Sequence, residues 1–217
     1  MPEGPEVAFL SKSLNIYYND NSFSSAYGKH LLLKNKEDWS FGLNGTVHIN
    51  EKNELIKNKD KWVSGNISSF TSISTFITTN KLGINWLTSS KQQIHTIVQQ
   101  WAHSKKTLAS LLLDQSQIAG IGVAWGSEIL FQSNLKPELK AIDQLINDSI
   151  INHFVTIIAH IGIHALYQYD IYLSKAKNNQ DLKNVVQNWY HNLYAERTMH
   201  VYKKGKKIKV GGRSWWV

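Results

Sequence analysis

The hydrophobic pattern of this 217-residue chain changes at Thr88-Ser89-Ser90, and this change constrains the fold more than any other feature. Before it, His30–Leu33 has the composition of a buried strand, Asn44-Gly45 is a hairpin signal, and residues 67–79 alternate Ser and Thr with Ile and Phe as strands do. After it, the apolar spacing is helical. We therefore predict an α+β protein, with one helix and a β-sandwich in residues 1–90 and a helical domain in residues 91–217.

Apolar periodicity places the helices of the second half, and Ser90 is expected to cap the first of them. A basic β-hairpin is expected at about residues 198–217, which hold six Lys or Arg, no acid and two glycine turns. The helices are predicted at Ile94–Trp101, Thr107–Leu113, Ala124–Gln132, Ile142–Leu166 and Leu182–Tyr194.

Composition narrows the choice of partner and excludes some metal chemistry. A net charge of +8 and a pI near 9.5 favour an anionic partner such as nucleic acid, although many basic proteins have none. The absence of cysteine excludes disulfides and Cys-ligated zinc. His160 and His164 have the spacing of metal ligands, but no third ligand is evident, so no metal and no cofactor is predicted. No apolar run approaches a membrane span and no signal peptide is evident, so we expect a cytoplasmic monomer without membrane contact.

The N-terminus carries residues suited to covalent chemistry. If Met1 is removed, Pro2 exposes a secondary amine with a pKa of ~8, against ~10.4 for a lysine side chain. A neutral amine of this kind can attack a sugar aldehyde carbon and form an iminium. Glu3 can shuttle protons, and Glu6 lies one residue into a helix that Pro5 is suited to begin. The alternative is that Pro2 is incidental and both glutamates only favour a helix N-terminus.

The string Met-Pro-Glu-Gly-Pro-Glu-Val at residues 1–7 closely resembles the start of the formamidopyrimidine-DNA glycosylase / endonuclease VIII family. Members of that family excise oxidised bases and then nick the strand, with the N-terminal proline as nucleophile. The resemblance implies that Pro2 is the nucleophile, that Glu3 assists opening of the sugar ring, and that Glu6 positions groups or relays protons.

Residues 105–137 predict a helix, a tight turn at Gly120-Ile121-Gly122 and a second helix. Glycines let the backbone approach a phosphate, although such a turn is more often an ordinary helix connection. The segments Leu-Leu-Asp-Gln, Ile-Ala-Gly-Ile-Gly and Ser-Glu-Ile-Leu-Phe resemble the helix–two-turn–helix element of the same family. The resemblance implies that Gly120 and Gly122 contact DNA. Val123 replaces the usual Asn and offers only its backbone N–H, and Ser110 stands where Lys is frequent.

The tail resembles the C-terminal finger of the family without its four zinc cysteines, which is called a zincless finger. The matching strings are Val-Tyr-Lys-Lys-Gly at 201–205 and Gly-Gly-Arg-Ser-Trp-Trp at 211–216. Arg213 matches the finger-tip arginine that grips phosphates, because a guanidinium can donate two hydrogen bonds to one phosphate. Lys204 is expected to add a weaker contact. The alternative is a solvated basic tail.

Three matches in residues 1–90 are less specific. Tyr27–Leu33 resembles the family segment in which a lysine binds a phosphate at the lesion, which implies that role for Lys29. Phe41-Gly42-Leu43-Asn44-Gly45 resembles the family loop whose apolar residue fills the gap left by a flipped base, which implies that role for Leu43. Lys81-Leu82-Gly83 falls near the family's Arg-Phe-Gly loop, which implies DNA contacts for Lys81 and Leu82.

These matches together predict a bifunctional DNA glycosylase/AP lyase of base-excision repair that acts on damaged double-stranded DNA. The Lys29 segment comes roughly half as far along the chain as in the family, so the resemblance implies a shortened sheet domain. One alternative is therefore a weakly active or inactive DNA-binding module that keeps the fold, which this shortening and Val123 favour. Another is an RNA- or ribosome-associated protein that uses only the helix–two-turn–helix. The residues do not determine the preferred lesion. The metal-free finger resembles that of the endonuclease VIII branch, which implies oxidised pyrimidines.

Overall fold

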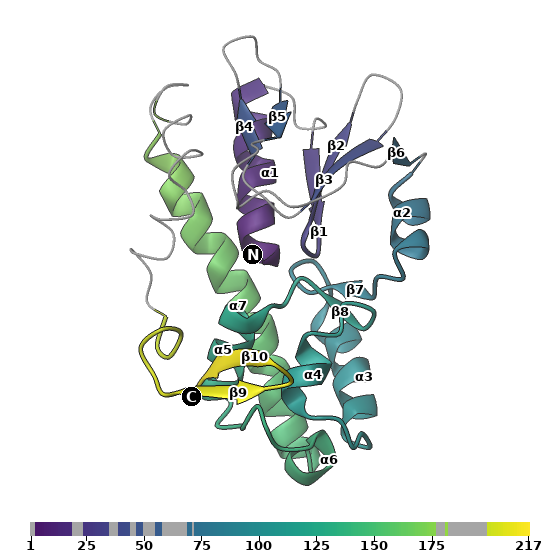
Figure 1. The fold of residues 1–217 in the computed structure, drawn as a ribbon, viewed down its shortest axis with the longest axis vertical. Helices are drawn as coiled ribbons and strands as arrows, with labels where there is room; N and C mark the ends of the chain where they lie inside the picture. Colours follow the sequence, from purple (N-terminus) through teal and green to yellow (C-terminus); the bar gives the residue numbers. More distant parts are fainter. Residues whose placement is uncertain are drawn as a thin grey trace. The chain divides into compact units, whose positions relative to one another are not determined.

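The computed structural model describes residues 3–18, 24–34, 39–43, 47–49, 55–57, 69–70, 72–176, 181 and 199–217 (Figure 1). The chain forms two compact units. Unit 1 comprises Met1–Asn80 and Ala165–Arg197, and unit 2 comprises Lys81–His164 and Thr198–Val217. The predicted domain limits of 1–90 and 91–217 remain a prediction, since a compact unit is defined by packing and not by independent folding.

Unit 1 is built on helix α1 (Gly4–Tyr18), which packs on the first two strands of an antiparallel sheet. The sheet order is β1-β2-β3-β6. A separate antiparallel pair is formed by β4 and β5. The core of unit 1 includes the buried side chains of Val7, Phe9 and Leu10 of α1 and of Leu31 and Leu32 of β2. The strands are β1 (Ser24–Tyr27), β2 (His30–Lys34), β3 (Trp39–Leu43), β4 (Val47–Ile49), β5 (Leu55–Lys57) and β6 (Ser69–Phe70).

The strand prediction for residues 67–79 is wrong over its second half. Only Ser69–Phe70 is a strand there, and Ile73–Thr79 forms helix α2. The Ser72 side chain accepts a hydrogen bond from the N–H of Thr75 and so caps this helix, while Phe76 is buried. Ile73 and Phe76 are also three residues apart, so this short stretch suits a helix as well as a strand. The predicted Asn44-Gly45 turn and the Leu182–Tyr194 helix lie outside the described residues.

Unit 2 is mainly helical, as predicted. A capping box between Ser90 and Gln93 starts α3, which confirms the predicted cap. The core is formed by large buried side chains, among them Trp86, Trp101, Phe154 and Trp215. The helices are α3 (Lys91–Trp101), α4 (Leu108–Leu112), α5 (Val123–Gln132), α6 (Ala141–Gln144) and α7 (Asp148–Ser174), and the strands are β7 (Ile84–Asn85), β8 (Ile118–Ala119), β9 (Lys207–Val210) and β10 (Arg213–Trp216).

The predicted Ile142–Leu166 helix is two helices, α6 and α7, in the structure. Asn147 accepts a hydrogen bond from the N–H of Ile150, so a new helix begins at Asp148.

Helix α7 contains a long apolar stretch, Asp148–Ile171, with mean hydropathy 1.5. This stretch is long and apolar enough to cross a membrane, so the prediction that no apolar run approaches this length is wrong. The apolar composition has a structural cause, because α7 supplies buried residues to unit 2 up to His164 and to unit 1 beyond it.

Candidate functional site

Two glutamates are buried at the start of α1. The side chain of Glu6 is fully buried and Glu3 is only 6% exposed. The backbone N–H of Glu3 donates to Oε2 of Glu6 at 2.8 Å, which is the side-chain-to-backbone half of a capping box. Glu6 therefore fixes the backbone of the residue that follows Pro2. Pro2 itself lies outside the described residues.

Tyr169 of α7 contacts the same carboxylate within unit 1. Its hydroxyl donates to Oε1 of Glu6 at 3.5 Å, and its ring packs against Phe9 with centroids 5.3 Å apart. Sequence reasoning did not find Tyr169, because no local pattern relates residues 163 positions apart. A buried tyrosine in an apolar helix was the available signal, since its hydroxyl requires a partner.

Lys29 lies half-buried in the tight turn between β1 and β2, where Tyr27 pairs with His30. Gly28 has a φ of 56°, a conformation that favours glycine. Burial, and secondly the charge of Lys29, lower the pKa of His30 from 6.5 to about 4. His30 is therefore neutral beside Lys29 at physiological pH. Leu43 ends β3 opposite His30, which places its backbone next to this turn.

His30 should make the protein less stable in mild acid. Its pKa is about 4 in the folded protein and near 6.5 in the unfolded chain, so between these values the unfolded chain binds more protons. We expect the free energy of unfolding to be unaffected by His30 above pH 6.5 and to fall as the pH drops towards 4. Because the ring is partly exposed, the expected loss is up to about 2 kcal/mol.

Urea unfolding of His30→Gln across this pH range measures the effect. The variant should lose less stability with acid than the parent protein. His153→Gln, at an exposed position on α7, is the matched control and should leave the slope of unfolding free energy against pH unchanged. If this slope is the same in His30→Gln as in the parent protein, the lowered pKa of His30 is contradicted.

The Gly120-Ile121-Gly122 turn is held by the side chain of Gln115. Its Oε1 accepts the N–H of Gly120 at 2.8 Å, and its Nε2 donates to the carbonyl of Ile121 at 2.9 Å. The N–H of Gly120 is thus engaged within the turn. Gly120 has a φ of 113°, which L side chains rarely adopt, and Gly122 is the N-cap of α5 without a side-chain cap. Val123 is the first residue of α5 and is half-buried.

Lys81 and Leu82 directly precede a parallel pair between β7 and β8. Ile84 pairs with Ile118 and Asn85 with Ala119. The N–H of Gly83 donates to the carbonyl of Gln115 at 2.9 Å, so the loop is tied to the helix–two-turn–helix. Lys81 is exposed with a φ of 50°, and Leu82 is half-buried.

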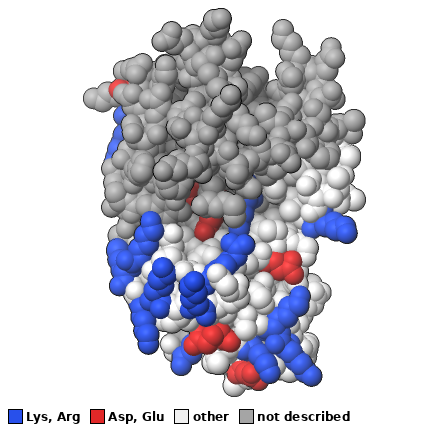
Figure 2. Space-filling model, in the orientation of Figure 1, with Lys and Arg blue, Asp and Glu red and all other residues white. Residues whose placement is uncertain are grey.

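The predicted basic hairpin is present as β9 and β10. Gly211 and Gly212, with φ of 56° and 75°, form its tip, and Arg213 pairs with Val210. Figure 2 shows Lys and Arg side chains gathered over the region that the hairpin occupies in Figure 1. Lys204 is exposed, and its Nζ donates to the carbonyl of Met199 at 2.7 Å. Within residues 199–217, the exposed basic residues are Lys203, Lys204, Lys206, Lys207, Lys209 and Arg213.

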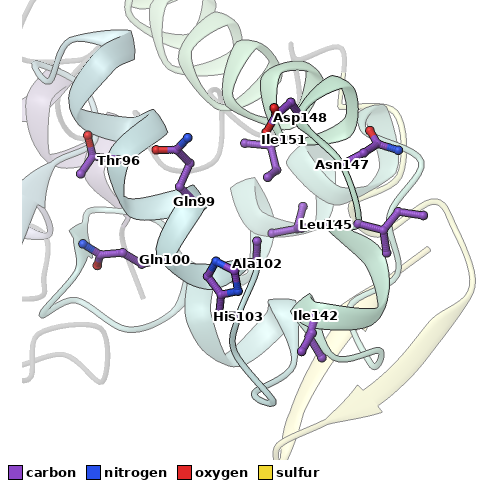
Figure 3. Close-up of a pocket in the computed structure, with 11 residues that line it drawn as sticks. Thr96, Gln99, Gln100, Ala102, His103, Ile142, Leu145, Asn147, Asp148 and Ile151 are labelled. Carbon is purple, nitrogen blue, oxygen red and sulfur yellow. The ribbon is translucent and has the colours of Figure 1, made fainter.

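Other potential sites are separate from these residues. Among the described residues, no group of three or more His, Cys, Asp or Glu side chains could hold a metal ion. The rings of His160 and His164 stack with centroids 6.2 Å apart. A pocket of unit 2 is lined by residues of α3, α6, the start of α7 and the segments that follow α3 and α6, among them Gln99, His103 and Asp148 (Figure 3). None of the predicted site residues lines it.

The predicted site residues therefore fall into two groups. Unit 1 holds two pairs of them, Glu3 with Glu6 at the start of α1, and Lys29 with the backbone of Leu43 at the β1–β2 turn. Unit 2 holds the loop, turn and hairpin residues, which are Lys81, Leu82, Gly120, Gly122, Val123, Lys204 and Arg213.

Residues 82–166 match the family model described as the formamidopyrimidine-DNA glycosylase H2TH domain. These residues form an H2TH domain of the formamidopyrimidine-DNA glycosylase family. The match confirms the resemblance predicted from the Leu-Leu-Asp-Gln and Gly-Ile-Gly strings. The H2TH domain thus extends from Leu82 into α7. A comparison with curated protein sequences finds no significant match.

Solved structures extend the similarity in fold to the whole chain. Lactococcus lactis Fpg in complex with abasic-site DNA is similar to this chain, with a TM-score of 0.69 and 16% sequence identity. The same protein in complex with oxidised-pyrimidine DNA has a TM-score of 0.69 and 17% sequence identity. MutM in complex with carbocyclic 8-oxo-G DNA is similar at 0.68 with 15% identity. Each alignment covers 99% of this chain and 97% of the other. The α+β class and the Fpg fold are confirmed.

Proposed function

We propose that this protein is a bifunctional DNA glycosylase and AP lyase that acts on oxidatively damaged double-stranded DNA. The observation that carries the proposal is the buried Glu3–Glu6 arrangement directly after Pro2, in a chain with the Fpg fold. Two buried carboxyl groups require a reason, because burial disfavours the charged form of a carboxylate. Proton transfer beside an amine nucleophile supplies that reason for Glu3, and the hydrogen bond accepted from the Glu3 N–H supplies it for Glu6.

The proposed reaction begins when the Pro2 nitrogen attacks C1′ of the damaged nucleotide as the bond from C1′ to the base breaks, and the departing base takes the proton that the nitrogen loses. The carboxyl group of Glu3 donates a proton to the ring oxygen of the sugar, so that the bond from C1′ to this oxygen breaks and a cationic iminium joins Pro2 to C1′. The iminium makes the C–H bond at C2′ acidic. The resulting Glu3 carboxylate takes that proton, and the electron pair expels the phosphate from C3′, which cleaves the strand. Glu6 acts by holding the backbone of Glu3.

Binding would rest on phosphate contacts from both units. Lys29 is half-buried in the β1–β2 turn of unit 1, and Arg213 is exposed next to the hairpin tip of unit 2. Such contacts orient the DNA without reading its sequence. The damaged nucleotide would leave the base stack to reach Pro2, and Leu43 and Leu82 would fill the gap.

Borohydride trapping tests the chemistry directly. Borohydride reduces an iminium to a stable amine, so correctly processed protein incubated with abasic-site DNA should become covalently linked to it. Intact mass should first show that Met1 has been removed. The absence of an adduct with processed protein would contradict the enzyme proposal.

A catalytically inactive DNA-binding module is the second candidate. Val123 at the start of α5 and the engaged N–H of Gly120 favour it, because both reduce the hydrogen bonds that the H2TH turn can offer to a phosphate. This module would bind abasic-site DNA and give no borohydride adduct.

Arg213→Ala should weaken binding to lesion-containing DNA by about ten- to a hundredfold, because a charge-assisted contact contributes roughly 1.5–3 kcal/mol. The loss should be similar for different lesions, and the slope of log affinity against log salt should fall by about one unit. Fluorescence anisotropy at several salt concentrations measures both quantities. Lys204→Ala should have a smaller effect. Unchanged affinity and slope in Arg213→Ala would make the hairpin a solvated tail.

A further inference from the structure

Glu128, in the middle of α5, is buried, and no Lys or Arg among the described residues forms an ion pair with it. The residue is 2% exposed. Its Oε2 accepts the backbone N–H of His200 at 2.9 Å, and its Oε1 accepts those of Val201 and Tyr202 at 2.8 Å each. One carboxylate therefore receives three consecutive backbone donors from the segment that leads into the hairpin.

This arrangement fixes the path of residues 200–202. A buried carboxylate is costly unless hydrogen bonds replace its lost hydration, and three successive N–H groups form a concave anion site that does so. Hydrogen bonds to an ionised acceptor are also stronger than neutral ones. Nδ1 of His200 lies a further 3.5 Å from Oε2 of Glu128 and adds attraction when that ring is protonated.

The two residues before Glu128 in α5 hold the other end of the hairpin. Ser127 Oγ accepts the N–H of Trp216 at 3.2 Å. Gly126 faces the buried ring of Trp215, where an added Cβ would lie 3.0 Å from the indole. The hairpin base is closed by two backbone hydrogen bonds between Lys206 and Val217, at 2.9 and 3.0 Å. Three consecutive residues of α5 thus seat the base of the hairpin, and only its tip projects.

We propose that Glu128 is the positioning residue of the basic hairpin and acts on DNA through Arg213. The proposal rests on the proposed function of the hairpin. Glu128 sets where β9 begins, and the β9–β10 register then fixes where Arg213 stands relative to the H2TH turn that follows Gly120. Glu128 itself is too buried to contact DNA.

The charge of Glu128 gives this proposal an unusual test. Glu128→Gln removes one acid, so the net charge rises from 24 − 16 = +8 to 24 − 15 = +9. Simple electrostatics would then strengthen DNA binding. We expect the opposite, a loss of about tenfold in affinity for abasic-site DNA, because the amide presents an NH₂ group to backbone donors and the hairpin shifts. Glu138→Gln makes the same charge change at an exposed loop position and should bind no more weakly than the parent.

A double-mutant cycle separates positioning from general destabilisation. In the Arg213→Ala background, Glu128→Gln should cause little further loss. A full tenfold loss in that background, or unchanged affinity in Glu128→Gln alone, would overturn the proposal. If Glu128→Gln does not fold, Ser127→Ala removes the Trp216 link and should show the same non-additivity with Arg213→Ala.

Hydrogen exchange tests the anchor without DNA. The amides of His200, Val201 and Tyr202 should lose protection in Glu128→Gln, while those of α3 keep theirs. Retained protection at residues 200–202 would refute the anchor itself. If the anchor is lost as expected but Arg213→Ala binds DNA normally, the proposed function of the hairpin fails and the positioning proposal fails with it.

Discussion

Pro2→Gly is expected to reduce the borohydride-trapped adduct by about two orders of magnitude or more, the scale on which loss of a covalent nucleophile acts. The secondary amine of proline gives an iminium that is cationic without further protonation. The primary amine of glycine gives an imine that must first gain a proton to become an electron sink. Trapping on a preformed abasic site, followed by separation of free and linked DNA, measures the difference.

Glu3→Gln is the informative control for this loss. It should remove excision of a damaged base, which needs proton donation, and retain part of the adduct with a preformed abasic site, where the base is already absent. Trapping of Pro2→Gly at the level of the parent protein would show that the proline ring is not needed, and peptide mapping of the adduct would then tell the amine of the introduced glycine from a lysine side chain. Both variants must be shown by intact mass to lack Met1.

Features that depend on a few neighbouring residues were predictable from the sequence. The Ser90 cap is encoded by Ser90 and Gln93, and the hairpin by a run of alternating residues around Gly211-Gly212. The H2TH turn was predictable for the same reason, because its glycines and Gln115 lie within eight positions of one another in the sequence. In each case a short segment contains both the hydrogen-bond donor and its acceptor.

Features that depend on distant residues were not predictable. Tyr169 meets Glu6 across 163 positions, and Glu128 meets residues 200–202 across more than 70. The Ser-Glu pair at 127–128 was evident only as part of a family-like string, and its role follows from where the chain returns. The strand prediction for residues 73–79 was wrong for another reason. The pattern of seven residues fits a strand and a helix almost equally, and the Ser72 cap favours the helix.

Gly83→Ala should be the most destabilising single methyl addition among the described glycines that lie close to backbone atoms. An added Cβ would lie 2.1 Å from the carbonyl oxygen of Gln117, which accepts the N–H of Ile84 at 3.0 Å. The backbone cannot rotate away as a side chain could, so the β7–β8 pair must separate. The indole N–H of Trp101 also donates to the side chain of Gln117, so the strain reaches the core of the H2TH domain.

We expect Gly83→Ala to lower the free energy of unfolding by about 3 kcal/mol or more, the upper range for overpacking, with a fall in Tm of roughly 6–12 °C. Gly212→Ala is the matched control, because its Cβ would meet no atom within 4 Å and its cost comes only from a φ of +75°, about 1–2 kcal/mol. Calorimetry of both variants compares the clash with backbone strain alone. A loss in Gly83→Ala no larger than that in Gly212→Ala would mean that the loop can move away from Gln117. Lys81 and Leu82 would then not be held by the H2TH turn, and their proposed contacts with DNA would lose their structural basis.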